Sequence, residues 1–178
     1  MTLVQFNQLQ AHLATQVLLS CVPLTTWSKQ LLAGRPYQDC EQLYQAAYML
    51  AQQWQWPELW TALAHHPRLG EQTAAQPLSE QALQFSQYEQ ARFSAQLHAD
   101  TSQTISEHNA LQQVILLAHQ AYENKFGHIF LIRASQRSAA EILAELQRRL
   151  KHDVITEQQE IKQQLIEITL IRLKQVVR

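Results

Sequence analysis

Residues 156–178 read TEQQEIKQQLIEITLIRLKQVVR, and apolar residues recur in them every three or four positions. This spacing places the apolar side chains on one face of an α-helix. No glycine or proline interrupts the stretch. The sequence therefore predicts a helix from Thr156 to the last residue, with one face in a hydrophobic core.

The same spacing recurs along most of the chain, starting with Phe6, Leu9 and Leu13. Start and stop signals divide it into further helices. These are residues 6–21, Pro23 to about Leu32, a helix capped by Asp39, a short one opened by Pro57, Ser79 to about Ala99, a long one capped by Thr101 or Ser102 and stopped by Gly127, and one opened by a Ser138 capping box. In the long helix, the predicted buried face consists of Ala110, Val114, Leu117, Ala118 and Ala121. Residues 129–132 are apolar without helical spacing, which predicts an extended buried segment.

Length and composition favour one helical domain. The chain has 178 residues, with 3 Gly and 5 Pro, whereas a β-sandwich or barrel needs more glycine-bearing turns. We expect a single compact all-α domain over residues 1–178, of about seven or eight helices and without a significant sheet. Gly34, Gly70 and Gly127 are too far apart for a phosphate-binding loop, which excludes nucleotide enzymes of the P-loop or Rossmann type.

The charge balance and the cysteines limit the classes of partner and the cellular compartment that we expect. The net charge is −1, from 14 Lys and Arg against 15 Asp and Glu, which attracts neither nucleic acid nor an anionic membrane. No apolar run approaches the roughly 20 residues that span a bilayer, and residues 1–5 lack the basic region of an export signal. Cys21 and Cys40 have no CxxC spacing. We therefore expect two reduced thiols in a cytoplasmic protein without nucleic-acid or membrane partners.

Two common kinds of catalytic site are not indicated. The 8 histidines lack the HExxH and paired ExxH spacings of helical metal sites, so no metal is expected. His119 and Glu123 lie four residues apart, which fits a solvated surface pair better than a metal site. The sequence has no GxSxG motif, and neither cysteine has an activating neighbourhood.

Glu89 is the first of three unusual residues. It lies on the core-facing side of its predicted helix beside Phe85, together with Ser86 and Gln90. A buried carboxylate needs hydrogen-bond donors, and burial without them would raise its pKa. Alternatively, Glu89 lies at the edge of the core and pairs with Arg92 or with a neighbouring helix.

Arg172 is the second. At about 100° per residue it falls inside the apolar stripe of the last helix, between Ile161 and Ile168. An unpaired guanidinium there costs several kcal/mol, so it needs an anionic partner, either Glu89 or the carboxylate of a ligand. A side chain that reaches solvent at the end of the helix is the alternative.

His66 is the third. Because it precedes Pro67, we expect it at the end of a helix and in extended geometry. An imidazole there is not expected to fill the core, and its ordinary pKa of about 6.5 suits it to move protons near neutral pH. The other histidines, including His65, are expected on the surface.

Three motifs occur in order along the chain: HPRLG at residues 66–70, SQYEQ at 86–90 and YENKFG at 122–127. Each motif is weak by itself, but the ordered set is specific. In this order and at these separations, the motifs resemble the family of urate breakdown that decarboxylates 2-oxo-4-hydroxy-4-carboxy-5-ureidoimidazoline (OHCU) to (S)-allantoin and CO2. The likeness extends from the region of Trp27 to residues 168–173.

The resemblance implies an all-helical carboxy-lyase that needs no cofactor, forms a homodimer and binds OHCU. It places the catalytic histidine at His66 and the substrate-holding residues at Ser86, Glu89 and Gln90, with Pro67 beside the histidine. It also implies main-chain contacts to the substrate from His128, Ile129, Phe130, Leu131 and Ile132. Many members read Phe-Gly-Phe-Pro-Phe where this chain has FGHIF at 126–130. A role for the side chain of His128 therefore does not follow.

The chemistry of OHCU agrees with these residue types. The substrate has a carboxylate and a hydroxyl on one carbon, next to a C=N bond that can accept the electron pair released with CO2. On this hypothesis His66 takes the hydroxyl proton or delivers the proton that sets the S configuration, and Glu89 orients the imidazole or the ureido group. Ser86 and Gln90 bind the ring amides, and Arg172 pairs with the substrate carboxylate or with Glu89.

Two other functions stay open at this point. One is a helical interaction module without catalysis, in which Glu89 and Arg172 form an internal ion pair. The other is a related enzyme that acts on a different ureide. Convergence of His66, Glu89 and Gln90 on one small pocket favours an enzyme, whereas an exposed apolar groove favours the module.

Overall fold

The computed structural model of the chain describes residues 1–68, 79–99, 105–133 and 137–178, apart from the side chains of residues 90, 92–99, 105–110 and 112. The described residues form nine α-helices and no strand. In chain order the helices are α1 (Leu3–Gln8), α2 (Ala11–Cys21), α3 (Thr25–Ala33), α4 (Cys40–Ala51), α5 (Trp56–Leu63), α6 (Glu80–Ala99), α7 (Ile105–Phe126), α8 (Ala139–Arg149) and α9 (Val154–Val176). None of these helices is long and apolar enough to cross a membrane. The predicted caps Thr101 and Ser102, and also Gly70, lie outside the described residues.

Local start signals act as predicted. Asp39 caps α4, where its Oδ1 accepts a hydrogen bond from the Gln42 N–H at 2.8 Å. Ser138 opens α8 in a reciprocal capping box with Glu141, and Pro57 lies in the first turn of α5. Side-chain acceptors at such positions satisfy backbone N–H groups that have no partner within the helix, so these residues determine where the helices begin.

Three boundaries differ from the prediction. The last helix ends at Val176 and not at the last residue, because Val177 is extended. The helix expected over residues 6–21 is two helices, because Leu9 and Gln10 have extended ψ angles of 138° and 141°. This break accounts for the ninth helix. The last helix begins two residues before Thr156, since Asp153 is the cap and its Oδ1 accepts from the Thr156 N–H at 2.7 Å.

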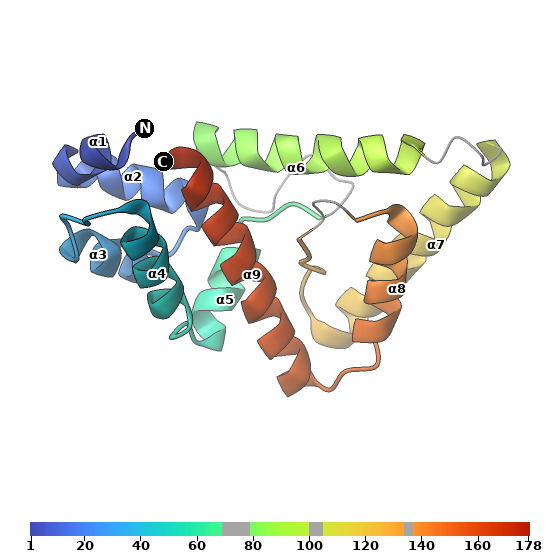
Figure 1. Cartoon of the computed structure of the whole chain (residues 1–178). Coiled ribbons are helices and arrows are strands. Elements are labelled where there is room, and N and C mark those ends of the chain that lie inside the picture. Colours follow the sequence, from blue (N-terminus) through green and yellow to red (C-terminus); the bar gives the residue numbers. More distant parts are fainter. Residues whose placement is uncertain (69–78, 100–104, 134–136) are drawn as a thin grey trace.

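The last helix organises the core (Figure 1). It crosses the middle of the molecule, with α1–α5 on one side and α7 and α8 on the other, while α6 extends along one edge. It packs against α2, α4 and α5. A first hydrophobic cluster surrounds the buried Trp27, whose indole N–H donates to the Ala47 carbonyl O at 3.0 Å. A smaller second cluster contains Tyr122, Ile142 and Leu146 of α7 and α8.

Residues 129–132 lie between the two clusters. The chain here belongs to no helix or strand. Ile129 and Leu131 pack into the first cluster, whereas Phe130 and Ile132 belong to the second. Alternation of this kind is the period of two of an extended chain, in which successive side chains point to opposite sides. The prediction of an extended buried segment is confirmed.

The buried face of α7 differs from the prediction. Val114 and Leu117 are 44% and 62% exposed, and Ala121 is also exposed. Of the other predicted residues, Ala118 is partly buried and packs against the second cluster, and the side chain of Ala110 lies outside the described residues. The described side chains that this helix buries are Ile115, His119 and Tyr122. Because α7 carries apolar residues on more than one side, spacing alone did not identify the side that faces the second cluster.

Candidate active site

His66 lies in the turn that follows α5. The helix ends at Leu63, and the His66 N–H donates to the Leu63 carbonyl O at 3.0 Å. Only 6% of His66 is exposed, so the expectation that it would stay out of the core is wrong. Burial disfavours the imidazolium, and the charges of Arg172 and His65 add to this effect, so the pKa of His66 is held well below its ordinary value of 6.5. His66 is therefore neutral near pH 7 and can accept a proton.

Arg172 and Glu89 form a two-point ion pair between α9 and α6. Arg172 Nε donates to Glu89 Oε1 at 3.0 Å, and Nη2 donates to Oε2 at 2.8 Å. The arginine side chain is 6% exposed and the glutamate side chain 40% exposed. The guanidinium thus lies in the core with one of its two predicted partners, and the solvent-reaching alternative is wrong. Glu89 lies at the edge of the core and pairs with a neighbouring helix, which was the second of its two predicted positions.

Two further contacts hold Arg172 in place. Its Nη1 donates to the Cys21 carbonyl O at 3.3 Å, and its guanidinium lies 5.6 Å from the centre of the Phe85 ring, at cation–π distance. Burial raises the pKa of the Cys21 thiol to about 12, although Arg172 opposes this shift. Cys21 is a free cysteine, but a thiol that keeps its proton is a poor nucleophile.

Three other predicted binding residues lie on α6 or next to His66. Ser86 is 4% exposed and lies one turn before Glu89, so both face the same side of α6. Pro67 directly follows His66 and is half-buried. Gln90 belongs to α6, but its side chain lies outside the described residues.

His128 opens the predicted substrate segment and is buried among aromatic rings. It is 8% exposed, so the expectation of a surface histidine is wrong. Its ring centre lies between 5.2 and 6.2 Å from those of Trp56, Trp60, Tyr122 and Phe126. Burial lowers the pKa of His128. A neutral imidazole packs as a flat ring, which explains why histidine can stand where many family members have phenylalanine.

Arg68 and Glu123 connect the first and third motifs, a contact that sequence analysis missed. Arg68 Nε and Nη2 donate to the two Glu123 oxygens at 2.6 and 2.7 Å. The predicted surface pair of His119 and Glu123 is wrong, because His119 is buried with its ring centre 5.7 Å from that of Phe130. The only signal for the Arg68 contact was the presence of both residues in motifs, since helical spacing says nothing of partners 55 positions apart.

A groove of about 700 Å³ lies elsewhere, between α2 and the start of α6. Leu13, Val17, Ser20 and Gln81 are among its lining residues, and none of the predicted site residues lines it. Among the described residues, no group of three His, Cys, Asp or Glu side chains is placed to hold a metal ion.

A family model for OHCU decarboxylases matches residues 7–174. The chain belongs to the OHCU decarboxylase family. This agrees with the order of the three motifs, and it makes the chain a member of a family of carboxy-lyases that act in urate degradation. The resemblance stated from the sequence is thereby confirmed.

Individual relatives agree with this membership. The chain is 28% identical to the uric acid degradation bifunctional protein TTL of Arabidopsis thaliana over 153 residues. This matched stretch covers 86% of this chain and 44% of that protein. The chain thus spans less than half the length of this curated relative. A crystal structure of OHCU decarboxylase in the presence of (S)-allantoin has a TM-score of 0.65 and 23% identity, over 89% of this chain and 94% of that one. A crystal structure of (S)-allantoin synthase has a TM-score of 0.64 and 16% identity, over 99% of this chain and 54% of that one. At these identities the two structures show a common fold.

Proposed function

We propose that this chain converts OHCU to (S)-allantoin and CO2 without a cofactor. The observation that carries the proposal is a buried, neutral His66 close to the ion pair of Arg172 and Glu89, in a chain that belongs to the OHCU decarboxylase family. A neutral imidazole can accept a proton, and a lowered pKa makes the resulting imidazolium a strong acid that readily returns it. Of the functions left open by the sequence, family membership favours an enzyme over an interaction module. Convergence of His66, Glu89 and Gln90 on one pocket stays a prediction, because the side chain of Gln90 lies outside the described residues.

His66 acts as the proton carrier in the proposed reaction. The bond to the carboxylate carbon breaks, CO2 leaves, and the electron pair moves through the neighbouring carbon to the imine nitrogen, which takes a proton from solvent. The resulting enol passes its hydroxyl proton to His66 and becomes a carbonyl. The imidazolium returns that proton to the neighbouring carbon on one face, which sets the S configuration. The lowered pKa of His66 favours this order, because the residue starts as a base.

Glu89 binds the ureido group in this proposal, and Arg172 positions Glu89. A carboxylate offers about four acceptor sites, and the two-point ion pair with Arg172 uses two of them. The others remain for ureido N–H groups on the exposed side of the carboxylate. Ser86 contributes a hydroxyl from the same side of α6. Pro67, Gln90 and the main chain of residues 128–132 complete the proposed binding site, as the resemblance implies.

The proposal is tested by following OHCU itself. Urate oxidase and hydroxyisourate hydrolase generate OHCU from urate, and circular dichroism monitors its decay. The protein should accelerate the decay and yield (S)-allantoin. Decay at the spontaneous rate would contradict the proposed function.

Variants test the role of the histidine. His66→Asn should fold and lose stereospecific decarboxylation, whereas His12→Asn is the matched control because His12 is exposed on α2. Full activity in His66→Asn would remove this residue from the mechanism.

We further propose that the protein is a cytoplasmic homodimer. Its family membership supports the dimer, and two free cysteines are compatible with a reducing compartment. Sedimentation equilibrium at micromolar concentrations measures the oligomeric state, and a monomeric mass at all concentrations would contradict the dimer.

A further inference from the structure

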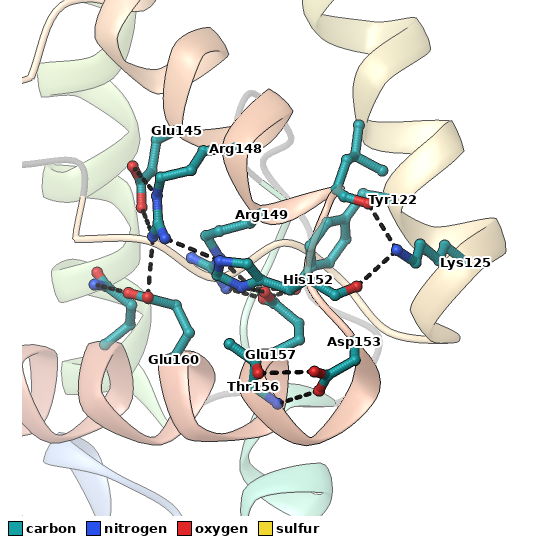
Figure 2. A network of polar contacts seen from close by, with 12 residues as sticks. Tyr122, Lys125, Glu145, Arg148, Arg149, His152, Asp153, Thr156, Glu157 and Glu160 are labelled. Carbon is teal, nitrogen blue, oxygen red and sulfur yellow. Dashed lines mark hydrogen bonds and ion pairs between the residues drawn. The ribbon is translucent and has the colours of Figure 1, made fainter.

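A second buried charge cluster lies at the junction of α7, α8 and α9 (Figure 2). The side chains of Arg149 and Glu157 are both 0% exposed, and Arg149 Nε donates to Glu157 Oε1 at 2.9 Å. The Tyr122 hydroxyl donates to the same oxygen and accepts from Arg149 Nη2 at 3.3 Å. His152 Nδ1 lies 2.9 Å from the other Glu157 oxygen. Burial and Glu157 both raise the pKa of Tyr122, although Arg149 opposes the shift, so its hydroxyl keeps the proton that it donates.

Arg149 also reaches the extended segment between the two clusters. Its Nη1 donates to the Leu131 carbonyl O at 2.7 Å, and its guanidinium lies 4.5 Å from the centre of the Phe130 ring. Residues 129–132 belong to no helix or strand, so their buried carbonyls need partners from side chains or water. Gln164 of α9 contributes a second contact, because its Oε1 accepts from the Arg133 N–H at 2.9 Å. Side chains of α8 and α9 thus hold the main chain of the segment.

The contact at Leu131 determines where the neighbouring N–H points. In a trans peptide the carbonyl and the following N–H are antiparallel, and the described cis peptide bond, Arg35–Pro36, lies elsewhere. With the Leu131 carbonyl directed at Arg149, the Ile132 N–H is directed away from it. Side-chain burial fixes which cluster each residue faces, and Arg149 additionally fixes the rotation of this peptide plane.

Stability alone does not require this charge cluster. A buried ion pair is often no more stabilising than well-packed apolar side chains of similar volume. An arginine differs from such side chains in presenting several N–H groups in fixed directions, which serve Glu157, Tyr122 and Leu131 at once. We propose that Arg149 is a positioning residue that holds the Leu131 carbonyl and thereby sets the main-chain groups of residues 129–132 that bind the substrate. The substrate contact rests on the proposed function, whereas the hold on the segment does not.

The experiment compares two charge-neutral double variants of the full-length protein. Arg149→Met with Glu157→Gln removes the contact to Leu131 without leaving a buried charge unpaired. The matched control is Arg148→Met with Glu145→Gln. Arg148 is 49% exposed, pairs with Glu145 and Glu160 and contacts His152, but no described contact joins it to residues 129–132. Arg149→Lys is a second test variant, in case the first does not fold. It keeps a positive charge beside Glu157 but loses the several directed N–H groups of the guanidinium.

Two readouts follow, namely OHCU kinetics and amide hydrogen exchange. In both Arg149 variants the KM should rise about tenfold while kcat stays within about threefold, because a main-chain contact is made in the ground state and the transition state alike. Exchange at the Ile132 and Arg133 amides should accelerate about tenfold, since exchange reports local opening. The control should match the wild type in both readouts.

Three outcomes would contradict the proposed roles of Arg149 and of the segment. Unchanged exchange at Ile132 and Arg133 in folded Arg149 variants would show that Arg149 does not hold the segment. Faster exchange with a wild-type KM would show that the held segment does not bind the substrate. A wild-type protein without decarboxylase activity would overturn the proposed function, and exchange would then still decide whether Arg149 holds Leu131.

Discussion

Replacing His66 by asparagine should remove an acid sensitivity from the stability of the folded protein. In the unfolded chain the imidazole is exposed and titrates at its ordinary pKa of 6.5, whereas burial holds the folded pKa well below that value. Between the two pKa values the unfolded chain binds a proton that the folded chain does not. Stability is therefore fully retained above the unfolded pKa and falls as the pH drops through it. At about pH 5.5 the unfolded state gains about 1.4 kcal/mol from this proton, and less once the folded imidazole begins to titrate.

The assay is urea or thermal unfolding at about pH 8 and about pH 5.5. A change of about 1.4 kcal/mol corresponds to roughly 3–6 °C in the midpoint for a chain of this size. The wild type and the exposed-histidine control His12→Asn should lose about 1.4 kcal/mol more on acidification than His66→Asn. Contributions from other groups cancel in this comparison. An equal loss in all three proteins would refute the reasoning that a buried neutral His66 is the source.

Three other changes test the site and its surroundings. Arg172→Met and Glu89→Gln should each lower kcat/KM for OHCU, with a coupling energy in the double variant of about 0.5–3 kcal/mol, and strictly additive losses would contradict a joint role. Gly127→Ala should lower the free energy of unfolding by about 1–2 kcal/mol, because its φ of +78° is unfavourable for a residue with a side chain. A Cβ there would meet nothing closer than 3.9 Å, so the backbone conformation accounts for the cost. An unchanged urea midpoint would refute this. Thiol reagents at about pH 8 should modify the partly exposed Cys40 in the folded protein and Cys21 only on unfolding, because burial raises the pKa of Cys21 to about 12. Two fast thiols would contradict this assignment.

The helix caps could be predicted from the sequence because each depends on a few neighbouring residues. The caps at Asp39 and Ser138 depend on a side chain that reaches a backbone N–H three residues further on, so the local sequence suffices. The pairing of Arg172 with Glu89 was within reach for another reason. A charge on an apolar stripe needs an opposite charge on another core-facing position, and few residues of this chain meet that condition.

The buried face of α7, the buried histidines and the Arg68 contact could not be predicted, because they depend on how the helices pack. The spacing of Val114 and Leu117 is helical, but it cannot tell which side of α7 meets α8 when several sides are apolar. His66 was expected outside the core because it precedes a proline at the end of a helix, and His128 was expected on the surface. Both are buried, which lowers their pKa values and keeps the rings neutral. The contact of Arg68 joins segments far apart in sequence, and no local rule describes it.

The alternation of residues 129–132 between two hydrophobic clusters makes this segment sensitive to its length more than to its composition. Histidine at position 128 shows that an unusual side chain can be accommodated by its aromatic neighbours. An insertion or deletion of one residue is different, because it would transfer every later side chain of the segment to the opposite cluster. It would also turn the carbonyl of Leu131 away from Arg149. Homologous chains should therefore vary in the residues that follow Gly127 but keep their number constant.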